Sequence, residues 1–232
     1  MSALQHEKIK MLQAIEYKTI SADKMVIGAR KKQSHSTFLF VHQGGALIRL
    51  GKLEIPVVAG QGYWLPLNCL NALTILKGSL VSTLDFSVRS TISLPSAAGF
   101  VDDIAFISEL IAQLRTKKHS KQNDWQGSYG RLLRCARDFF SETQPNDRYG
   151  ADVKAVIKGL EKLAEGTDLS PQYASLFQMA FGIDNNDLHT QLVVRDWVRQ
   201  RKSGQSNAKI AAAASLKETD IAAQLEEVAG FI

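Results

Sequence analysis

The sequence predicts an α+β protein in which an antiparallel β-barrel or jelly roll precedes a helical hairpin and an all-helical C-terminal half. Three observations carry this prediction. Residues 38–86 contain short runs of β-branched and aromatic residues, separated by glycine-containing turns and uninterrupted by any helical segment. Beyond Pro95 the apolar residues recur at helical spacing, beginning near Asp102. After residue 150 the apolar segments all have this helical period.

The β-rich part is expected to contain six short strands. Gly51-Lys52 separates two of them and is typical of a two-residue hairpin, because glycine at the first turn position tolerates a positive φ. Alternation supports this pairing, since Ala46, Ile48 and Leu50 share one side and Arg49 lies on the other. The expected strands cover residues 38–41, 46–50, 53–58, 63–65, 72–76 and 80–86, and residues 4–15 are expected to form a short helix or an arm on the sheet.

Helical periodicity predicts two amphipathic helices between residues 102 and 142 and five more after residue 150. Asp102 and Asp103 open the first helix and Arg115 lies near its end, which suits the helix dipole. The apolar stripes of these two helices must be buried against the barrel, each other or another chain, and we predict that they form a dimer interface. The expected C-terminal helices cover residues 152–164, 171–181, 188–201, 207–214 and 219–228. We therefore divide the chain into a barrel (1–95), a dimerisation hairpin (96–142), a polar linker (143–150) and an all-helical region (151–232).

Composition is that of an ordinary globular protein, with 45% hydrophobic and 22% charged residues. No apolar run approaches the ~20 residues that a membrane span needs, and the N-terminus lacks the apolar core of an export signal. We therefore expect a cytoplasmic protein without a membrane partner, in which Cys69 and Cys135 are reduced. The net charge of the chain is +5, but residues 151–232 have a net charge of −2, because this part contains nine Lys and Arg residues and eleven Asp and Glu residues.

Two segments after residue 150 have the pattern of helix-turn-helix units. In residues 160–183 a helix ends before a turn, and Ser170 caps the helix that follows. In residues 207–231 small alanines allow two helices to approach each other around a turn at Ser215-Leu216-Lys217. The helix at 188–201 bridges the two units, and two bridged units are a stronger signal than either one alone.

These segments resemble the AraC family of transcription regulators. LSPQYASLFQMAFGI at 169–183 resembles the first recognition helix of that family, and SGQSNAKIA at 203–211 resembles the entry to its second unit. GQGYWLPLNCLNALTIL at 60–76 resembles a turn of its cupin-like barrel. The resemblance implies a cupin-like sensor barrel, a homodimer formed by the helical hairpin, a small-molecule effector and sequence-specific DNA binding.

DNA contacts are expected on the recognition helices and on the bridging helix, where glutamines read base edges and cations hold phosphates. The helix at 171–181 has no Lys or Arg, however, and the helix at 219–228 has a net charge of −3. The alternative is therefore an interaction module whose acidic helical region binds a protein. The expected DNA-binding residues are Gln172, Tyr173, Gln178, Arg195, Arg199, Arg201, Lys202 and Lys217.

The barrel is expected either to hold a small ligand or to be filled by its own side chains. The expected ligand-binding residues are Phe40, His42, Trp64, Asn71 and Phe86. Enzymes with cupin-like barrels bind a metal through several histidines, but Asn71 stands where the late histidine of that pattern falls. The sequence also has no GxSxG motif and no phosphate loop. We therefore predict no catalytic residue, metal or cofactor, which leaves a cupin enzyme as the least favoured alternative.

Overall fold

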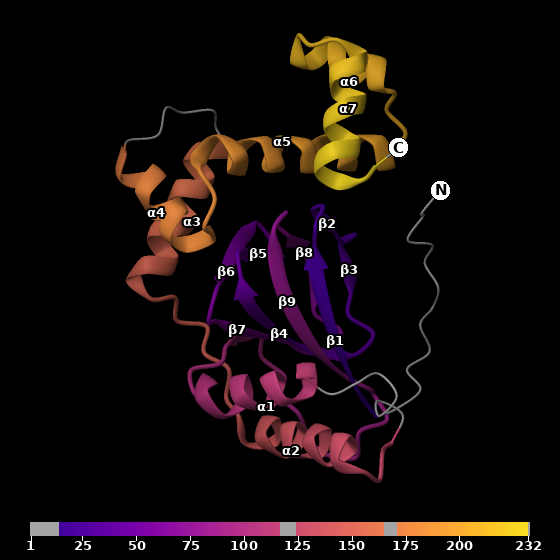
Figure 1. Cartoon of the computed structure of the whole chain (residues 1–232), viewed down its shortest axis with the longest axis vertical. Helices are drawn as coiled ribbons and strands as arrows, with labels where there is room; N and C mark the ends of the chain where they lie inside the picture. Colours follow the sequence, from indigo (N-terminus) through magenta and orange to yellow (C-terminus); the bar gives the residue numbers. More distant parts are fainter. Residues whose placement is uncertain (1–13, 117–123, 165–170, 232) are drawn as a thin grey trace.

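The computed structural model describes residues 14–116, 124–164 and 171–231. Two antiparallel sheets lie face to face at the centre of the molecule, followed in the chain by seven helices among these residues (Figure 1). Sheet A has the strand order β1-β9-β4-β7-β10, and sheet B has the order β2-β8-β5-β6, with β3 also pairing with β8. The strands are β1 (Ile15–Ala22), β2 (Val26–Ile27), β3 (Lys31–Lys32), β4 (Ser36–Gln43), β5 (Gly45–Leu50), β6 (Leu53–Val58), β7 (Gly62–Leu65), β8 (Leu70–Ile75), β9 (Ser79–Phe86) and β10 (Gly99–Phe100).

Strands β5 and β6 form the hairpin predicted at Gly51-Lys52. Their register pairs Leu50 with Leu53, which leaves two residues in the turn, and Gly51 has a φ of +62°. A residue with a side chain is strained at this φ, so glycine is the residue that the turn requires. Ala46 and Ile48 pack between the sheets, whereas Leu47 faces the C-terminal helices. The predicted alternation of this strand is therefore confirmed.

The space between the two sheets is filled by side chains from both of them. These side chains come from alternate positions of the strands, as expected when one face of each sheet is buried against the other. At most 1% of the surface is exposed for Leu39, Val41, Ala46, Ile48, Ile55, Val57, Tyr63, Leu65, Ile75 and Val81. The barrel was expected either to hold a ligand or to be filled by its own side chains, and in the structure its interior is filled by side chains.

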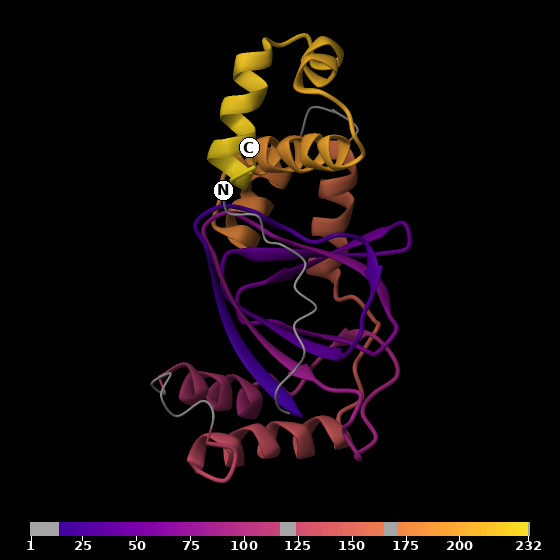
Figure 2. The same cartoon turned by 90° about the vertical axis from the view of Figure 1, so that its right-hand side faces the viewer.

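Helices α1 (Ile104–Thr116) and α2 (Ser128–Glu142) cover the outer face of sheet A (Figures 1 and 2). Phe140 of α2 stacks on Trp64, with ring centroids 4.8 Å apart and planes inclined by 25°. Its ring also contacts Phe38 and Phe86. This cluster contains most of the apolar stripes that predicted a dimer interface: Ile107, Ile111, Leu114, Leu133, Ala136 and Phe140. Those side chains cover the chain's own sheet, so their apolar character is explained without a second protomer.

The five C-terminal helices lie beyond the outer face of sheet B. They are α3 (Ala151–Ala164), α4 (Pro171–Phe181), α5 (Asn185–Lys202), α6 (Asn207–Ala214) and α7 (Glu218–Ala229). Helix α5 runs over sheet B in Figure 1, with α3 and α4 near one of its ends and α6 and α7 at the other. Leu47 and Leu76 pack against α3, α4 and the first half of α5, and Met25 packs among α5, α6 and α7.

All the predicted helices are present, and the six predicted strands are present with ends shifted by at most two residues. Strands β1, β2, β3 and β10 were not predicted. Residues 4–13 of the predicted arm lie outside the described residues, and Ile15 begins β1. In the predicted linker, Asn146 pairs with Phe100 through two backbone hydrogen bonds of 2.8 and 2.9 Å. Among the described residues, no helix combines the length and the apolarity that crossing a membrane requires.

Candidate functional site

The aromatic residues predicted to line a ligand site lie on the wrong face of the barrel for that role. Phe40, Trp64 and Phe86 belong to the cluster between sheet A and the helices α1 and α2. Their neighbours along the strands, such as Leu39 and Leu65, fill the barrel interior instead. Because both faces of these strands are apolar, alternation alone did not identify the inner face. Their expected placement inside the barrel is therefore corrected.

His42 and Asn71 lie apart from each other on different sheets. His42 shares the outer face of sheet A with Phe40, and its Nε2 lies 2.8 Å from Ser82 Oγ. Burial, with a smaller contribution from the charge of Arg115, lowers the pKa of His42. Asn71 is buried in β8 and donates from Nδ2 to the Cys69 carbonyl. The five predicted ligand residues are thus not gathered around one cavity.

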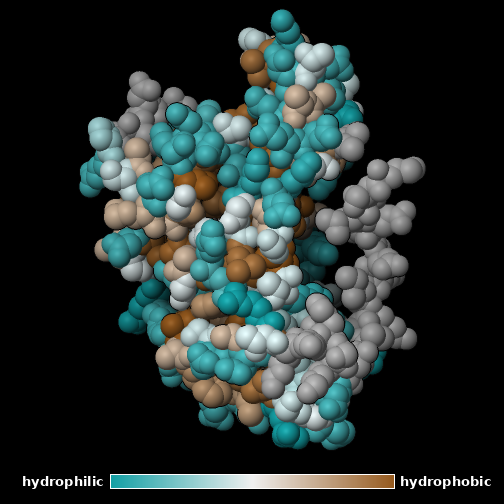
Figure 3. Space-filling model, viewed as in Figure 1, coloured by the Kyte–Doolittle hydropathy of each residue, from teal (hydrophilic) through white to brown (hydrophobic). Residues whose placement is uncertain are grey.

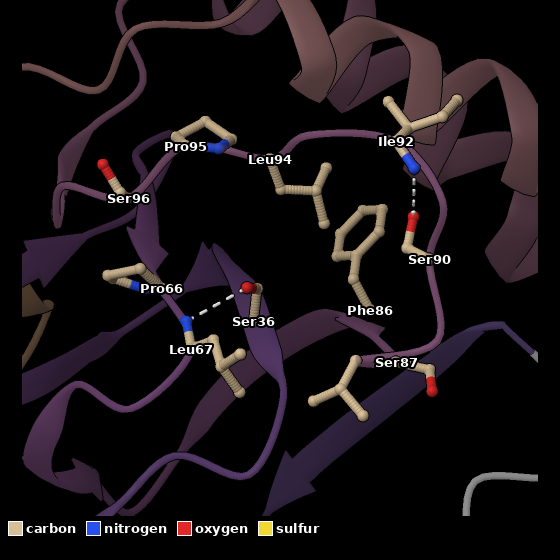
Figure 4. A pocket seen from close by; sticks show the side chains of 11 residues that line it. Ser36, Pro66, Leu67, Phe86, Ser87, Ser90, Ile92, Leu94, Pro95 and Ser96 are labelled. Atoms are coloured by element: carbon tan, nitrogen blue, oxygen red, sulfur yellow. Dashed lines mark hydrogen bonds between the residues drawn. The ribbon is translucent and has the colours of Figure 1, made fainter.

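One cavity of about 350 Å³ lies at the end of sheet A, beneath the segment 87–96 (Figure 4). Its lining is neutral and consists of Ser36, Pro66, Leu67, Phe86, Ser87, Val88, Ser90, Ile92, Leu94, Pro95 and Ser96. Trp64 Nε1 donates to the Pro95 carbonyl over 3.0 Å, which ties the segment to β7. Of the predicted ligand residues only Phe86 lines this cavity, whose lining suits an apolar molecule with a few polar groups.

A buried carboxylate lies on the inner side of sheet A. Asp85 accepts hydrogen bonds from Thr37 Oγ1 at 3.0 Å and Lys18 Nζ at 2.8 Å, and His35 Nε2 is 3.4 Å away. Burial by itself raises the pKa of Asp85, but hydrogen bonds and charges from His35 and Lys18 outweigh it and lower the pKa overall. The described residues contain no group of three metal-ligating His, Cys, Asp or Glu side chains.

The basic cluster predicted on the bridging helix is divided in the structure. Arg195 is 6% exposed and forms a two-pronged ion pair with Glu54 of β6, in which Nη2 lies 3.0 Å from Oε2. Lys202 Nζ points to the Ile27 carbonyl at 3.4 Å, and Arg201 donates to the Gln205 carbonyl. Arg195 and Lys202 therefore contact the β-region and Arg201 contacts the loop after its own helix, so the four cations do not form the single open surface that a phosphate backbone needs.

A second cavity, of about 360 Å³, lies where α5 meets sheet B. Arg199 and Lys202 of α5 line it together with Arg30 and Arg49 of the β-region. The remaining lining residues are Ile27, Gly28, Ala29, Ala72 and Ser203. Sequence reasoning did not connect Arg30 or Arg49 with α5, although Arg49 was placed on the side of its strand away from the apolar residues. We name this cavity the basic cavity.

The second predicted helix-turn-helix unit is formed by α6 and α7. The turn has three residues, and Ser215 adopts a left-handed conformation with a φ of +57° that closes α6. Ile210 and Ala211 pack against Ile221 and Leu225 across the turn. Lys217 occupies the N-cap position of α7 and is exposed. A three-residue turn is the length typical of this motif.

The first predicted unit pairs α3 with α4, and the turn between them lies outside the described residues. Gln172 and Gln178 are exposed on α4. Tyr173 is half-buried, and its ring lies beneath Lys162 of α3 with Nζ 5.0 Å from the ring centroid. Gln178 also borders a shallow groove between α4 and the start of α5. The two glutamines are therefore free to meet a partner, whereas Tyr173 is held against α3.

No family model matches this chain, and no curated protein matches it. Among solved structures, ToxT from Vibrio cholerae bound to (E)-4-(8-methylnaphthalen-1-yl)but-3-enoic acid is 14% identical, with a TM-score of 0.36 over 93% of this chain and 95% of that one. ToxT bound to an unsaturated fatty acid is 10% identical, with a TM-score of 0.35 over 93% and 91%. An RmlC-like cupin from Shewanella frigidimarina is 15% identical, with a TM-score of 0.29 over 33% and 69%. At these scores neither a ligand nor a residue role carries over to this chain.

Proposed function

We propose that the protein is a transcription regulator of AraC type, without catalytic activity, that acts in the cytoplasm and binds DNA through its two helix pairs under the control of an effector. The observation that carries this proposal is the arrangement of α3–α4 and α6–α7 near opposite ends of the single helix α5 (Figure 1). In the helix-turn-helix proteins that bind DNA, the second helix of each pair enters the major groove. Here those helices are α4 and α7.

The length of α5 supports two contacts on one DNA face. Its 18 residues span about 27 Å at 1.5 Å per residue. Successive major-groove sites on one face of a duplex lie about 34 Å apart. A pair of recognition helices attached near the two ends of such a helix is thus close to the spacing that adjacent grooves require.

The exposed side chains of α4 suit base reading better than phosphate binding. Gln172 and Gln178 offer amides that pair with adenine edges, and α4 carries no charge. Lys217 is an exposed cation in the turn between α6 and α7, at the start of α7. Because the acidic residues of α7 repel phosphates, affinity in this proposal depends on few cations.

Effector control is proposed to act through the contact of α5 with sheet B. Gln191 accepts a hydrogen bond from the Lys77 backbone over 2.8 Å, and Arg195 pairs with Glu54. A ligand that favours one arrangement of this contact shifts the population of chains whose helix pairs fit DNA.

Selection from a randomised duplex pool with the full chain tests the proposal. We expect enrichment of a defined sequence, and we expect Gln172→Ala with Gln178→Ala to lose that preference, at about 1–3 kcal/mol per base contact. Gln144→Ala removes an exposed glutamine from the 143–150 segment and serves as the matched control, with unchanged preference. Failure to enrich any sequence, with or without small-molecule extracts, contradicts the proposal.

A protein-interaction module is the second candidate, and the surface of α7 favours it. Glu218, Asp220, Glu226 and Glu227 are all exposed on this helix, and the surface over α6 and α7 is largely hydrophilic in Figure 3. Such a surface attracts a basic protein and repels DNA. This candidate predicts no sequence enrichment in the duplex selection. It also predicts salt-sensitive binding of a basic protein, which Glu226→Gln with Glu227→Gln weakens.

A further inference from the structure

The basic cavity between sheet B and α5 gathers four cations from three separate parts of the chain. Arg30 follows β2, Arg49 lies in β5, and Arg199 and Lys202 lie in the last turn of α5. Gly28 allows the segment between β2 and β3 to approach β8 closely, because a Cβ at that position would lie 2.9 Å from the Leu73 carbonyl oxygen. The β2–β3 segment therefore lies flat against β8 and forms one wall of the cavity.

The acidic groups near the cavity balance only part of this charge. Asp196 pairs with Arg199 at 3.0 Å, and the C-terminal end of α5 contributes about half a negative charge. Glu54 lies directly opposite Arg49 in the β5–β6 register, but its carboxylate is engaged by Arg195. An excess of about two positive charges therefore lines the cavity.

Two of the four cations have no partner among the described residues. Neither Arg30 nor Arg49 forms an ion pair or a side-chain hydrogen bond there, whereas Lys202 has the Ile27 carbonyl. Burial, followed by the positive charges of Arg195 and Arg49, lowers the pKa of Arg199. Arg49 and Arg199 are half-buried and Arg30 and Lys202 are exposed, and an anion placed between these like charges stabilises them.

We propose that the basic cavity binds a small phosphate-type dianion, either free phosphate or the phosphate group of a metabolite. Arginine forks match tetrahedral phosphate oxygens, and a dianion balances the excess of about two charges. The apolar part of the lining is limited to Ile27, Ala29 and Ala72, which leaves no long slot for an alkyl chain. A volume of about 360 Å³ is at the lower end of small-molecule sites.

The site joins the β-region to the helix that carries both helix pairs. A dianion held by Arg49 on one side and Arg199 on the other favours the docked arrangement of α5 on sheet B. In this regulatory part the inference rests on the proposed function, with the dianion as the effector. The binding of the dianion itself does not depend on whether α4 and α7 contact DNA.

Isothermal titration calorimetry of the full chain with inorganic phosphate tests the inference, with acetate at matched ionic strength as the monoanion comparison. We expect saturable binding of phosphate and none of acetate. Arg49→Gln and Arg30→Gln should each weaken phosphate binding by about tenfold, the loss of one charge-assisted contact. The control Lys209→Gln removes an exposed cation from α6 and should leave phosphate binding unchanged.

Three results would overturn the inference: no saturable phosphate binding by the folded protein, equal binding of acetate, or phosphate binding that both arginine variants retain. Arg30 is exposed and follows a short strand, so Arg30→Gln keeps the test valid if Arg49→Gln fails to fold. If instead the two variants lose affinity for a duplex of random sequence while phosphate does not bind, the cavity belongs to a DNA contact. A sequence preference without phosphate binding leaves the proposed function intact, and phosphate binding without DNA binding refutes only that function.

Discussion

The two faces of the β-sandwich are covered in different ways. Sheet A meets α1 and α2 through stacked aromatic rings, with Trp64 and Phe140 both fully buried. Sheet B meets the C-terminal helices through apolar side chains mixed with polar contacts, among them the Arg195–Glu54 ion pair and the Gln191–Lys77 hydrogen bond. The first contact is a hydrophobic core, whereas the second combines a hydrophobic cluster with the polar contacts found at interfaces between domains that move.

This difference indicates which contact is suited to regulation. Separating α1 and α2 from sheet A exposes large aromatic surfaces and costs the free energy of a core. Ion pairs and hydrogen bonds at the α5 contact exchange more readily with water or with a charged ligand. We therefore place structural stability in the sheet A contact and responsiveness in the sheet B contact.

The largest effect is expected from Phe140→Ala at the sheet A contact. Loss of a fully buried aromatic side chain removes its contacts with Trp64, Phe38 and Phe86 and leaves a cavity, which costs about 3–5 kcal/mol of unfolding free energy. Urea denaturation followed by tryptophan fluorescence measures it. Phe106→Ala, on the same helical layer but 50% exposed, is the control and should cost less than about 1 kcal/mol. Equal losses in the two variants would contradict the assignment of this contact as the core.

Arg195→Ala should have a smaller effect that is confined to the sheet B contact. It leaves the half-buried Glu54 carboxylate without its partner, and we expect a loss of about 2 kcal/mol, below the cost at a fully buried pair. Proteolysis within residues 143–150 should become faster, because the C-terminal helices are held less firmly. Arg137→Ala breaks an exposed pair with Asp138 and should change stability by about 0.5 kcal/mol or less. Unchanged proteolysis in Arg195→Ala would count against a separable contact.

Asp85 links stability to pH within the sandwich itself. Its pKa lies below the ordinary 3.8, so its stabilisation is complete above that value and is lost as the pH falls through the lower folded-state pKa. Between pH 7 and pH 3 the wild-type chain should therefore lose more unfolding free energy than Asp85→Asn, by at most about 1 kcal/mol, because much of the titration lies below pH 3. Denaturant titrations at the two pH values measure this. A larger acid loss in Asp85→Asn would show that the sign is wrong.

The smallest effect concerns self-association, which stays a prediction. The stripes expected at a dimer interface cover sheet A, but Phe106 and Phe139 remain partly exposed, with ring centroids 5.5 Å apart. If a homodimer uses this surface, Phe106→Asp should weaken it by about tenfold or more, with stability nearly unchanged. Sedimentation of both chains across micromolar concentrations measures it. If the wild-type chain is monomeric at every concentration, the predicted dimer is wrong.

The helices were predictable because each has a clear helical period, and six strands were predictable because glycine-containing turns separate short runs of β-branched and aromatic residues. The helix predicted at 188–201 begins earlier, at Asn185, because the Asp184 side chain accepts from the backbone N–H groups of Asn186 and Asp187. Strand β1 was missed because it carries Glu16 and Lys18, and Lys18 pairs with the distant Asp85 as well as with Glu16. Charged residues lower the strand propensity of the local sequence, even where a distant ion-pair partner accommodates them in the fold.

The candidate sites were harder to predict than the fold. Phe40, Trp64 and Phe86 were recognised as buried aromatics. Alternation does not indicate, however, whether a face of the sheet packs against the other sheet or against helices. Arg195 and Arg199 were recognised as a cluster with Arg201 and Lys202. Yet Glu54, which pairs with Arg195, and Arg49, which lines the basic cavity with Arg199, lie about 140–150 residues away. Spacing along the chain carries no information about such a contact. The basic cavity therefore emerged only from the packing of α5 on sheet B.

The spacing of the DNA contacts tests whether both helix pairs bind one duplex. If α4 and α7 enter successive major grooves, sequences selected by the full chain contain two short motifs about 10 base pairs apart. Inserting 5 base pairs between them moves one motif to the opposite face of the duplex, and fluorescence anisotropy should then show affinity falling to the nonspecific level. Inserting 10 base pairs should also lose affinity, because α5 fixes the distance between the two helix pairs. Affinity that is unchanged by either insertion, or a selected sequence with a single motif, would show that the two helix pairs do not read successive major grooves.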